Sequence, residues 1–397
     1  MICSGMVALS QVLAFPVPDC FLKTSSRLFF AAVTALLIVL LSGRPFIRKL
    51  VQYKIGQKIR EFAGQAFHLA ELHKQKKETP TMGGLLVIFS VTISILLWAD
   101  LSSIYTLLLL GALLVFGTVG AIDDFAKLKS KSFKGLPGKL RLLIQSLFAG
   151  LVVLLFACPS LFTALGLQLP AIQLFDHSIE WKTFQASMYL PFVCKPIFIA
   201  TGVWWLLIFF FEWLTIVGAA NAVNLTDGLD GLAAGCSVFT IGALCVLSFL
   251  SNNPSLAAYY SLPYVQSSGE ITVCLAALGG ACLGFLWYNT YPAQVFMGDT
   301  GSLAIGGMLG TAAVSLRREW FLALIGGVFV VETFSVIIQV ISFRHSGRRI
   351  FRCAPIHHHF EYAGLHEAKV VMRFWIVSLI LAVVGILSLL TNGPNSQ

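Results

Sequence analysis

The chain has 397 residues, of which 57% are hydrophobic and only 11% are charged. This composition excludes an ordinary soluble domain, in which about 25% of residues are charged. The formal net charge is +9, which we attribute to membrane topology and attraction to anionic lipid. No nucleic-acid-binding module is recognisable, so no nucleic-acid partner is expected.

Apolar segments recur along the whole chain, with short polar stretches between them. A helix that crosses a bilayer needs about 20 mostly apolar residues, and lipid satisfies no backbone polar groups, so each segment should be helical. We predict an all-α integral membrane protein, a single domain over residues 1–397 with about ten transmembrane helices. The predicted spans are 26–43, 83–100, 103–122, 140–160, 199–218, 231–251, 271–289, 302–316, 321–343 and 373–391.

The basic residues indicate the orientation of these helices. Most of them lie in three connecting segments, 44–80, 123–141 and 344–373, and cytoplasmic loops are the ones enriched in Lys and Arg. An even number of spans then places both termini outside, on the periplasmic side. Residues 1–25 form an outside tail in this topology, and 161–198 form the longest outside loop, for which a short hairpin is one interpretation.

The nine cysteines lie mostly within predicted spans and show no CxxC spacing. Neither a zinc site nor a disulfide framework is therefore indicated, and the odd count leaves at least one thiol unpaired. Cys158 and Cys194 flank the longest outside loop, and their pairing is left open.

The first motif in chain order is TPTMGG at residues 79–84, which follows a basic run at 74–77. Pro80 marks the entry to the second span, and the lysines suit either phosphate binding or a positive-inside anchor. Asp123 and Asp124 follow the third span. Neighbouring residues on a helix point about 100° apart, so we expect one carboxylate to face a site and a partner to hold the other.

Five of the eight aspartates gather at predicted cytoplasmic helix ends, which favours a site over a set of unrelated caps. The segment 221–231, NAVNLTDGLDG, spaces its polar residues three apart, which aligns them on one side of a helical turn. Asp299 opens the eighth span, where helix N-termini favour anionic groups; a simple N-cap is the alternative. Carboxylates and amides grouped in this way suit a nucleotide diphosphate with Mg²⁺, a cation that prefers oxygen ligands.

Polar residues also mark the ninth span and the loop that follows it. Glu332, Ser335 and Gln339 share one stripe, which should face the bundle interior or a polar groove, either as a structural seam or for catalysis. The loop contains the three consecutive histidines 357–359. Their side chains should diverge and bind one tetrahedral metal poorly, whereas imidazoles suit phosphate contacts or proton handling; a solvated loop is the alternative.

These motifs identify the sequence as similar to the phospho-N-acetylmuramoyl-pentapeptide transferase family, within the superfamily of polyprenyl-phosphate sugar-1-phosphate transferases. The resemblance covers residues from about 44 to 375. It rests on TPTMGG at 79–84, DD at 123–124, NAVNLTDGLDGL at 221–232, GFLWYN at 284–289, FMGDTGS at 296–302 and PIHHHFE at 355–361. TPTMGG together with PIHHHFE favours the peptidoglycan branch over relatives that transfer N-acetylglucosamine phosphate.

The resemblance implies a ten-helix enzyme of the bacterial cytoplasmic membrane that uses Mg²⁺. Its implied substrates are UDP-N-acetylmuramoyl-pentapeptide and undecaprenyl phosphate, and its products are lipid I and UMP. The implied metal ligand is Asp299, and the implied catalytic residues are Asp123, Asp124, Asp230, His357, His358 and His359. The implied substrate-binding residues are Lys76, Thr81, Asn221, Asn224, Asp227, Asn289 and Phe296.

The chain departs from the family pattern in two places near Lys76. Glu78 stands where the family usually has glycine, and the segment 61–72 is longer than usual. Both departures affect the expected placement of Lys76 and little else in the resemblance.

Several alternatives stay open at this point. We favour direct in-line attack by the lipid phosphate, with Asp123 orienting it or accepting its proton, over a covalent aspartyl intermediate. A related N-acetylhexosamine-1-phosphate transferase is the nearest alternative function. A transporter is a more distant one, since it should show mid-bilayer acids and a repeat between halves, and the sequence shows neither. The oligomeric state is open, a homodimer included.

Overall fold

The computed structural model describes residues 23–53, 79–129, 135–164, 166, 169–174 and 177–391. Within these ranges, eight helices are long and apolar enough to cross a membrane. They are α3 (Thr24–Gln52), α6 (Ile104–Lys129), α7 (Gly138–Ala157), α10 (Trp205–Thr226), α11 (Leu232–Ser251), α13 (Gly269–Asn289), α16 (Gly327–Ser346) and α18 (Glu367–Leu390). This set supports the prediction of a multi-pass membrane protein.

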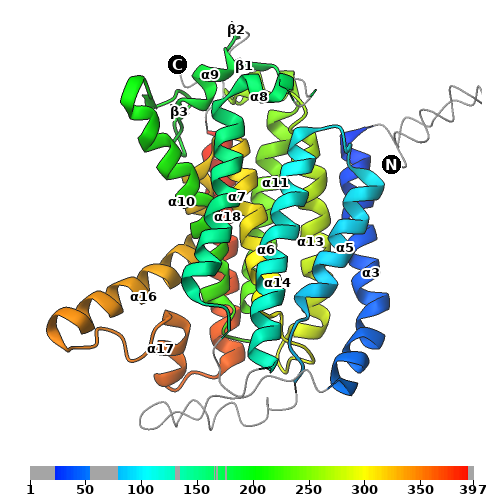
Figure 1. Ribbon diagram of the computed structural model, residues 1–397, viewed down its shortest axis with the longest axis vertical. Helices are drawn as coiled ribbons and strands as arrows, with labels where there is room; N and C mark the ends of the chain where they lie inside the picture. Colours follow the sequence, from blue (N-terminus) through cyan, green and yellow to red (C-terminus); the bar gives the residue numbers. More distant parts are fainter. Residues whose placement is uncertain are drawn as a thin grey trace, which may run out of the picture.

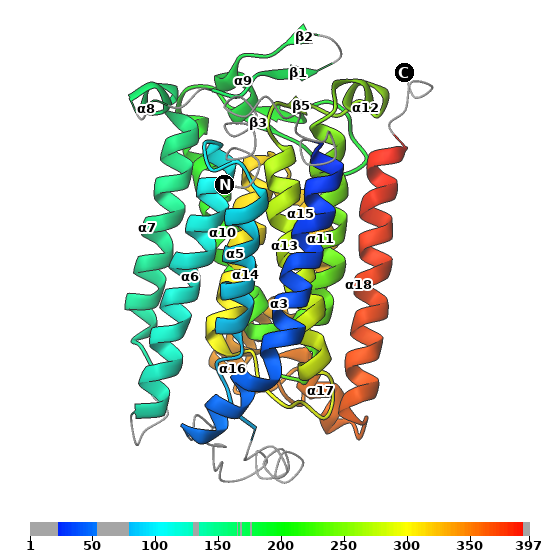
Figure 2. The same ribbon diagram turned by 90° about the vertical axis from the view of Figure 1, so that its right-hand side faces the viewer.

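Two other predicted spans are also helical, α5 (Gly84–Trp98) and α14 (Gly298–Ser315). Helix α14 packs mainly against α6 and α10 and lies in the middle of the bundle (Figure 1, Figure 2). Every residue of α14 from Thr300 to Ser315 is buried. The helix is rich in Gly, Ala, Ser and Thr, and small residues of this kind allow neighbouring helix backbones to approach closely.

Glycines fix the first turn of α14 against α5 and α6. A Cβ atom on Gly84 would lie 2.1 Å from the backbone nitrogen of Gly301, and a Cβ atom on Gly120 would lie 2.2 Å from the carbonyl oxygen of Asp299. The helices therefore touch backbone to backbone at these points. Any larger side chain would force them apart, so these two glycines determine where Asp299 lies relative to α6.

The TPTMGG segment binds the chain just before α14 through its backbone. Phe296 N donates to Pro80 O at 2.8 Å, Gly83 N donates to Phe296 O at 2.8 Å, and Gly84 N donates to Met297 O at 2.9 Å. These three hydrogen bonds align the entry to α5 with the entry to α14. The motif thus contributes to the fold even before any ligand is considered.

The prediction of one continuous span over 321–343 is wrong. Helix α15 (Glu319–Ile325) ends before Gly326, and α16 begins at Gly327. Glycine is a poor helix former, so two adjacent glycines are a natural break. Figure 1 shows α16 leaving the bundle at a steep angle, and apolar side chains such as Phe334 and Ile341 are exposed along it.

The all-α expectation also needs a correction at one end of the bundle. Two small antiparallel sheets lie there, β2-β1-β5 and β3-β4, so the hairpin interpretation of the outside loop is confirmed. The strands are β1 (Ile172–Leu174), β2 (His177–Ser178), β3 (Ser187–Met188), β4 (Phe198–Ile199) and β5 (Tyr264–Val265). The short helices here are α8 (Pro159–Ala164), α9 (Trp181–Gln185), η3 (Gly202–Trp204) and α12 (Pro254–Tyr259). Cys158 and Cys194 are free thiols, so they form no disulfide.

The opposite end of the bundle holds most of the polar motifs. The end of α6, the beginning of α14 and the short helix α17 (Ile356–Tyr362) all lie there, whereas the beginning of α3 and the end of α18 lie near the sheets (Figure 2). Motifs far apart in the sequence therefore meet at a single end of the molecule.

Candidate active site

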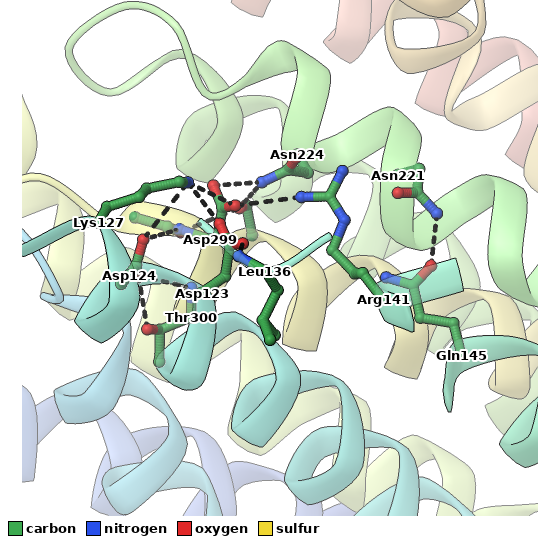
Figure 3. A network of polar contacts seen from close by, with 12 residues as sticks. Asp123, Asp124, Lys127, Leu136, Arg141, Gln145, Asn221, Asn224, Asp299 and Thr300 are labelled. Carbon is green, nitrogen blue, oxygen red and sulfur yellow. Dashed lines mark hydrogen bonds and ion pairs between the residues drawn. The ribbon is translucent and has the colours of Figure 1, made fainter. Parts of the chain in front are cut away.

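Three carboxylates converge where α6 meets α14. Asp123 and Asp124 lie in the last turns of α6, and Asp299 lies in the first turn of α14. One oxygen from each lies within 4.8 Å of the others (Figure 3). Three largely buried carboxylates repel one another unless positive charge lies nearby. The groups that pair with them therefore indicate what kind of ligand the site can bind.

Two basic side chains face this group. The Lys127 Nζ atom lies 2.6 Å from Asp123 Oδ2 and 2.8 Å from Asp299 Oδ2. The Arg141 Nη1 atom, from α7, lies 3.2 Å from Asp299 Oδ2. In the sequence, both residues stand out only as basic residues of the predicted cytoplasmic loops. The i,i+4 spacing of Asp123 and Lys127 could have predicted their contact. The contact of Arg141 with Asp299 could not be predicted in this way, because it depends on where the fold places α7 relative to α14.

The two neighbouring aspartates have different partners, as their angular separation predicted. Asp124 accepts hydrogen bonds from Asp299 N at 3.2 Å, Thr300 N at 3.0 Å and Thr300 Oγ1 at 2.7 Å. The first N–H groups of a helix lack partners within it, so Asp124 caps α14 from a neighbouring helix. Asp123 instead accepts from Leu136 N at 2.7 Å and pairs with Lys127.

The two asparagines of NAVNLTDGLDG lie near the end of α10 and point to different neighbours. Asn224 Nδ2 donates to Asp299 Oδ1 at 2.9 Å and to Ser302 Oγ at 3.0 Å. Asn221 Nδ2 donates to Gln145 Oε1 of α7 at 2.8 Å. Asn224 therefore belongs to the carboxylate group, whereas Asn221 lies beside it (Figure 3).

Asp227 follows directly after α10, close enough for the negative charges of Asp299 and Asp124 to affect its carboxyl group. Burial raises the pKa of its carboxyl well above the usual range, and the carboxylates of Asp299, Asp124 and Asp230 raise it further, while a hydrogen bond from the Gly298 backbone opposes the shift. Among the described residues, five carboxyl groups therefore lie near only two basic side chains, Lys127 and Arg141. A bound cation would relieve that excess.

Asp230 and Asn289 organise loops in the structure and do not join the three carboxylates. Asp230 Oδ2 accepts from Ala293 N at 3.0 Å. Asn289 accepts from Gly231 N at 3.1 Å and donates to Val295 O at 2.8 Å. These bonds link the loop after α10 to the loop after α13. The catalytic role of Asp230 and the substrate-binding role of Asn289 stay predictions.

Thr81 and Phe296 also lie close to the start of α14. Thr81 Oγ1 is buried without a hydrogen-bond partner and faces Gly298, where an added Cβ would lie 3.1 Å from it. Phe296 contributes its backbone to the pairing with the TPTMGG segment. Lys76, with the Glu78 and 61–72 departures, lies outside the described residues.

The three consecutive histidines diverge, as predicted. Each ring nitrogen Nδ1 has a different partner: Glu332 Oε2 at 3.0 Å for His357, Glu361 Oε2 at 2.7 Å for His358, and the Arg352 backbone N–H at 3.1 Å for His359. His357 is fully buried, so the alternative of a solvated loop is wrong for this residue. The other two rings are partly exposed.

Comparison with known proteins gives one consistent family. The chain matches the model described as glycosyl transferase family 4 over residues 106–317. It is similar to the phospho-N-acetylmuramoyl-pentapeptide-transferase of Protochlamydia amoebophila, with 44% identity over 98% of this chain and 99% of the relative. Relatives of the same name from Maridesulfovibrio salexigens and Syntrophus aciditrophicus are 44% and 45% identical, over 91% of this chain and 92% of each relative.

Proposed function

Because this chain belongs to the phospho-N-acetylmuramoyl-pentapeptide transferase family, we propose that it transfers phospho-N-acetylmuramoyl-pentapeptide from UDP-N-acetylmuramoyl-pentapeptide to undecaprenyl phosphate. The products are lipid I and UMP. The names of the relatives support this donor over another N-acetylhexosamine nucleotide, and they give no support to a transporter.

One observation carries the assignment of the site, namely that Lys127 joins Asp123 and Asp299 at the convergence of three carboxylates. The ammonium group of Lys127 lies between two of these carboxylates, so positive charge is stabilised at this position. Oxygen donors of this kind fit Mg²⁺. Asp299 is the most accessible of the three, with 18% of its side chain exposed against 3% for Asp123 and 5% for Asp124, so we assign the main ligand role to Asp299.

In the proposed reaction, an oxygen of the lipid phosphate attacks the phosphorus that carries the sugar. The bond from that phosphorus to the bridging oxygen breaks, and UMP leaves with the bridging oxygen. Mg²⁺ held by Asp299 would supply charge neutralisation for the diphosphate. Lys127 and Arg141 exchange their contacts with Asp299 for phosphate oxygens, and Asp123, which Leu136 N holds in place, orients the lipid phosphate.

Removal of divalent cations should abolish this activity. We expect UMP release by the purified protein to fall at least about a hundredfold in EDTA, because the three carboxylates then repel the donor diphosphate. Excess Mg²⁺ should restore the rate, whereas NaCl of equal ionic strength, which screens charge without coordinating, should not. Release that continues unchanged in EDTA would exclude a metal role for the carboxylates.

We also propose ten membrane crossings, with α15 and α16 forming one broken crossing. The eight long apolar helices, together with α5 and α14, support this count. The beginning of α3 and the end of α18 lie at the same end of the bundle, as an even count requires (Figure 2). In this topology the carboxylates face the cytoplasm of a bacterial inner membrane, where a soluble nucleotide donor is available.

Reporter fusions test this orientation. Alkaline phosphatase fused after Thr391 should be active and green fluorescent protein at the same position dark, because the first folds only outside the cytoplasm and the second only inside it. Fusions after Lys129, at the other end of the bundle, are the matched control and should give the opposite pattern. A bright fluorescent fusion after Thr391 would invert the proposed topology.

A further inference from the structure

Glu332 is the one residue of the polar stripe on α16 that reaches the histidine motif. Ser335 Oγ donates to the Glu332 backbone at 2.6 Å within the same helix. Gln339 accepts from Ile350 N at 3.1 Å and from Phe351 N at 3.0 Å, which fastens the following loop to α16. These two residues have structural partners, whereas the Glu332 side chain points to His357.

The pair formed by Glu332 and His357 is completely enclosed. The two side chains are 0% exposed, and the His357 Nδ1 atom lies 3.0 Å from Glu332 Oε2. Because a carboxylate accepts hydrogen bonds, this contact suits the tautomer with hydrogen on Nδ1. The ring is thereby fixed in rotation, and Nε2 points away from α16.

The Nε2 atom of His357 faces the loop between α10 and α11. A Cβ atom on Gly228 would lie 2.3 Å from Nε2, so only glycine leaves room for the ring at this position. Nε2 itself is buried and has no hydrogen-bond partner. Leaving a buried polar atom unpaired is unfavourable, and a hydrogen bond to a ligand would remove that cost.

We propose that Glu332 is a positioning residue for the transfer reaction, which holds the His357 ring so that Nε2 meets a phosphate oxygen of the nucleotide donor beside Gly228. This inference rests on the proposed function, since the donor supplies that oxygen. An Nε2–H group on a ring held in this orientation donates a hydrogen bond to an anionic phosphate oxygen. Glu332 thus acts through His357 and does not touch the donor itself.

Glu332→Gln tests the inference by retaining shape and removing charge. We expect kcat/KM for the donor to fall about 10–100-fold, the effect of losing the partner that orients a functional histidine, while KM for the lipid acceptor stays unchanged. The melting temperature should change little, because the amide oxygen of glutamine can still accept the hydrogen bond from His357 Nδ1. A loss of stability in proportion to the loss of rate would overturn the inference in favour of a structural role.

A double-mutant cycle separates positioning from independent effects. Glu332→Gln combined with His357→Gln should be no slower than His357→Gln alone, because the carboxylate acts only through the ring. Glu361→Gln is the matched control, since Glu361 pairs with His358 in the same manner, and its effect should add to that of His357→Gln. Additive losses for Glu332 and His357 would overturn the inference.

A measurement that does not depend on turnover tests the positioning role of Glu332 separately from the proposed transferase activity. Spectra of protein labelled with ¹⁵N-histidine report which ring nitrogens carry hydrogen, and the His357 signals are assigned by their loss in His357→Gln. We expect Nδ1 to be protonated in the unsubstituted protein and the His357 signals to shift in Glu332→Gln. Identical His357 signals in both proteins would refute the positioning role even if the transferase assay succeeds, whereas a shift without transferase activity would contradict only the proposed substrates.

Discussion

Asp299→Asn should lower UMP release at least about a thousandfold, because the site would lose the proposed metal ligand and a negative charge that pairs with two cationic side chains. Lys127 and Arg141 both contact Asp299 Oδ2. An amide offers them a weaker neutral acceptor, or a donor that repels them. The measurement is kcat at saturating donor and lipid phosphate over a titration of Mg²⁺, together with the rise in melting temperature that we expect Mg²⁺ to produce in the unsubstituted protein.

Asp100→Asn is the matched control for this substitution. Asp100 is exposed at the other end of the bundle, where its carboxylate accepts from Ser102. The control should keep its turnover and its stabilisation by Mg²⁺, while Asp299→Asn should lose both. Turnover within tenfold of the unsubstituted protein in Asp299→Asn would remove this residue from the metal site and leave Asp123 and Asp124 to be tested.

Asp124→Ala should affect folding and catalysis together. Asp124 holds the first turn of α14 through the Asp299 and Thr300 backbone N–H groups and the Thr300 hydroxyl. Loss of a charged cap of this kind costs about 1–3 kcal/mol. Asp299 then loses its fixed position, so we expect turnover to fall about a hundredfold. Thermal unfolding and UMP release measure the two effects.

Asp123→Ala provides the contrast, because Asp123 accepts a hydrogen bond from Leu136 N and forms an ion pair with Lys127, and neither contact caps a helix. We expect it to lose turnover with a smaller decrease in melting temperature than Asp124→Ala. Asp124→Asn, which keeps one oxygen acceptor for Thr300, should recover part of the stability. Equal melting temperatures for the two alanine variants would contradict the assignment of Asp124 as the residue that holds α14.

The motif residues illustrate how far local spacing predicts contacts. The DD pair predicted that one carboxylate is held by a partner, because the angle between neighbours on a helix is a local property. Spacing by three in NAVNLTDGLDG predicted a common face, but α10 ends at Thr226. Asp230 consequently turns to Ala293 in the loop after α13, a contact that depends on how two distant loops pack.

The sequence alone determined the class of protein, because apolar segments of spanning length and the lack of backbone partners in lipid leave helices as the natural solution. The sequence also predicted a functional site near the ends of those helices, because acidic residues in membrane segments are costly and usually mark functional sites. Only the tertiary structure decided which groups meet. The contact of Arg141 with Asp299, the cap of α14 by Asp124 and the pairing of Glu332 with His357 join segments 158, 176 and 25 residues apart. Close packing of glycines and helix ends sets such distances, and no local pattern encodes them.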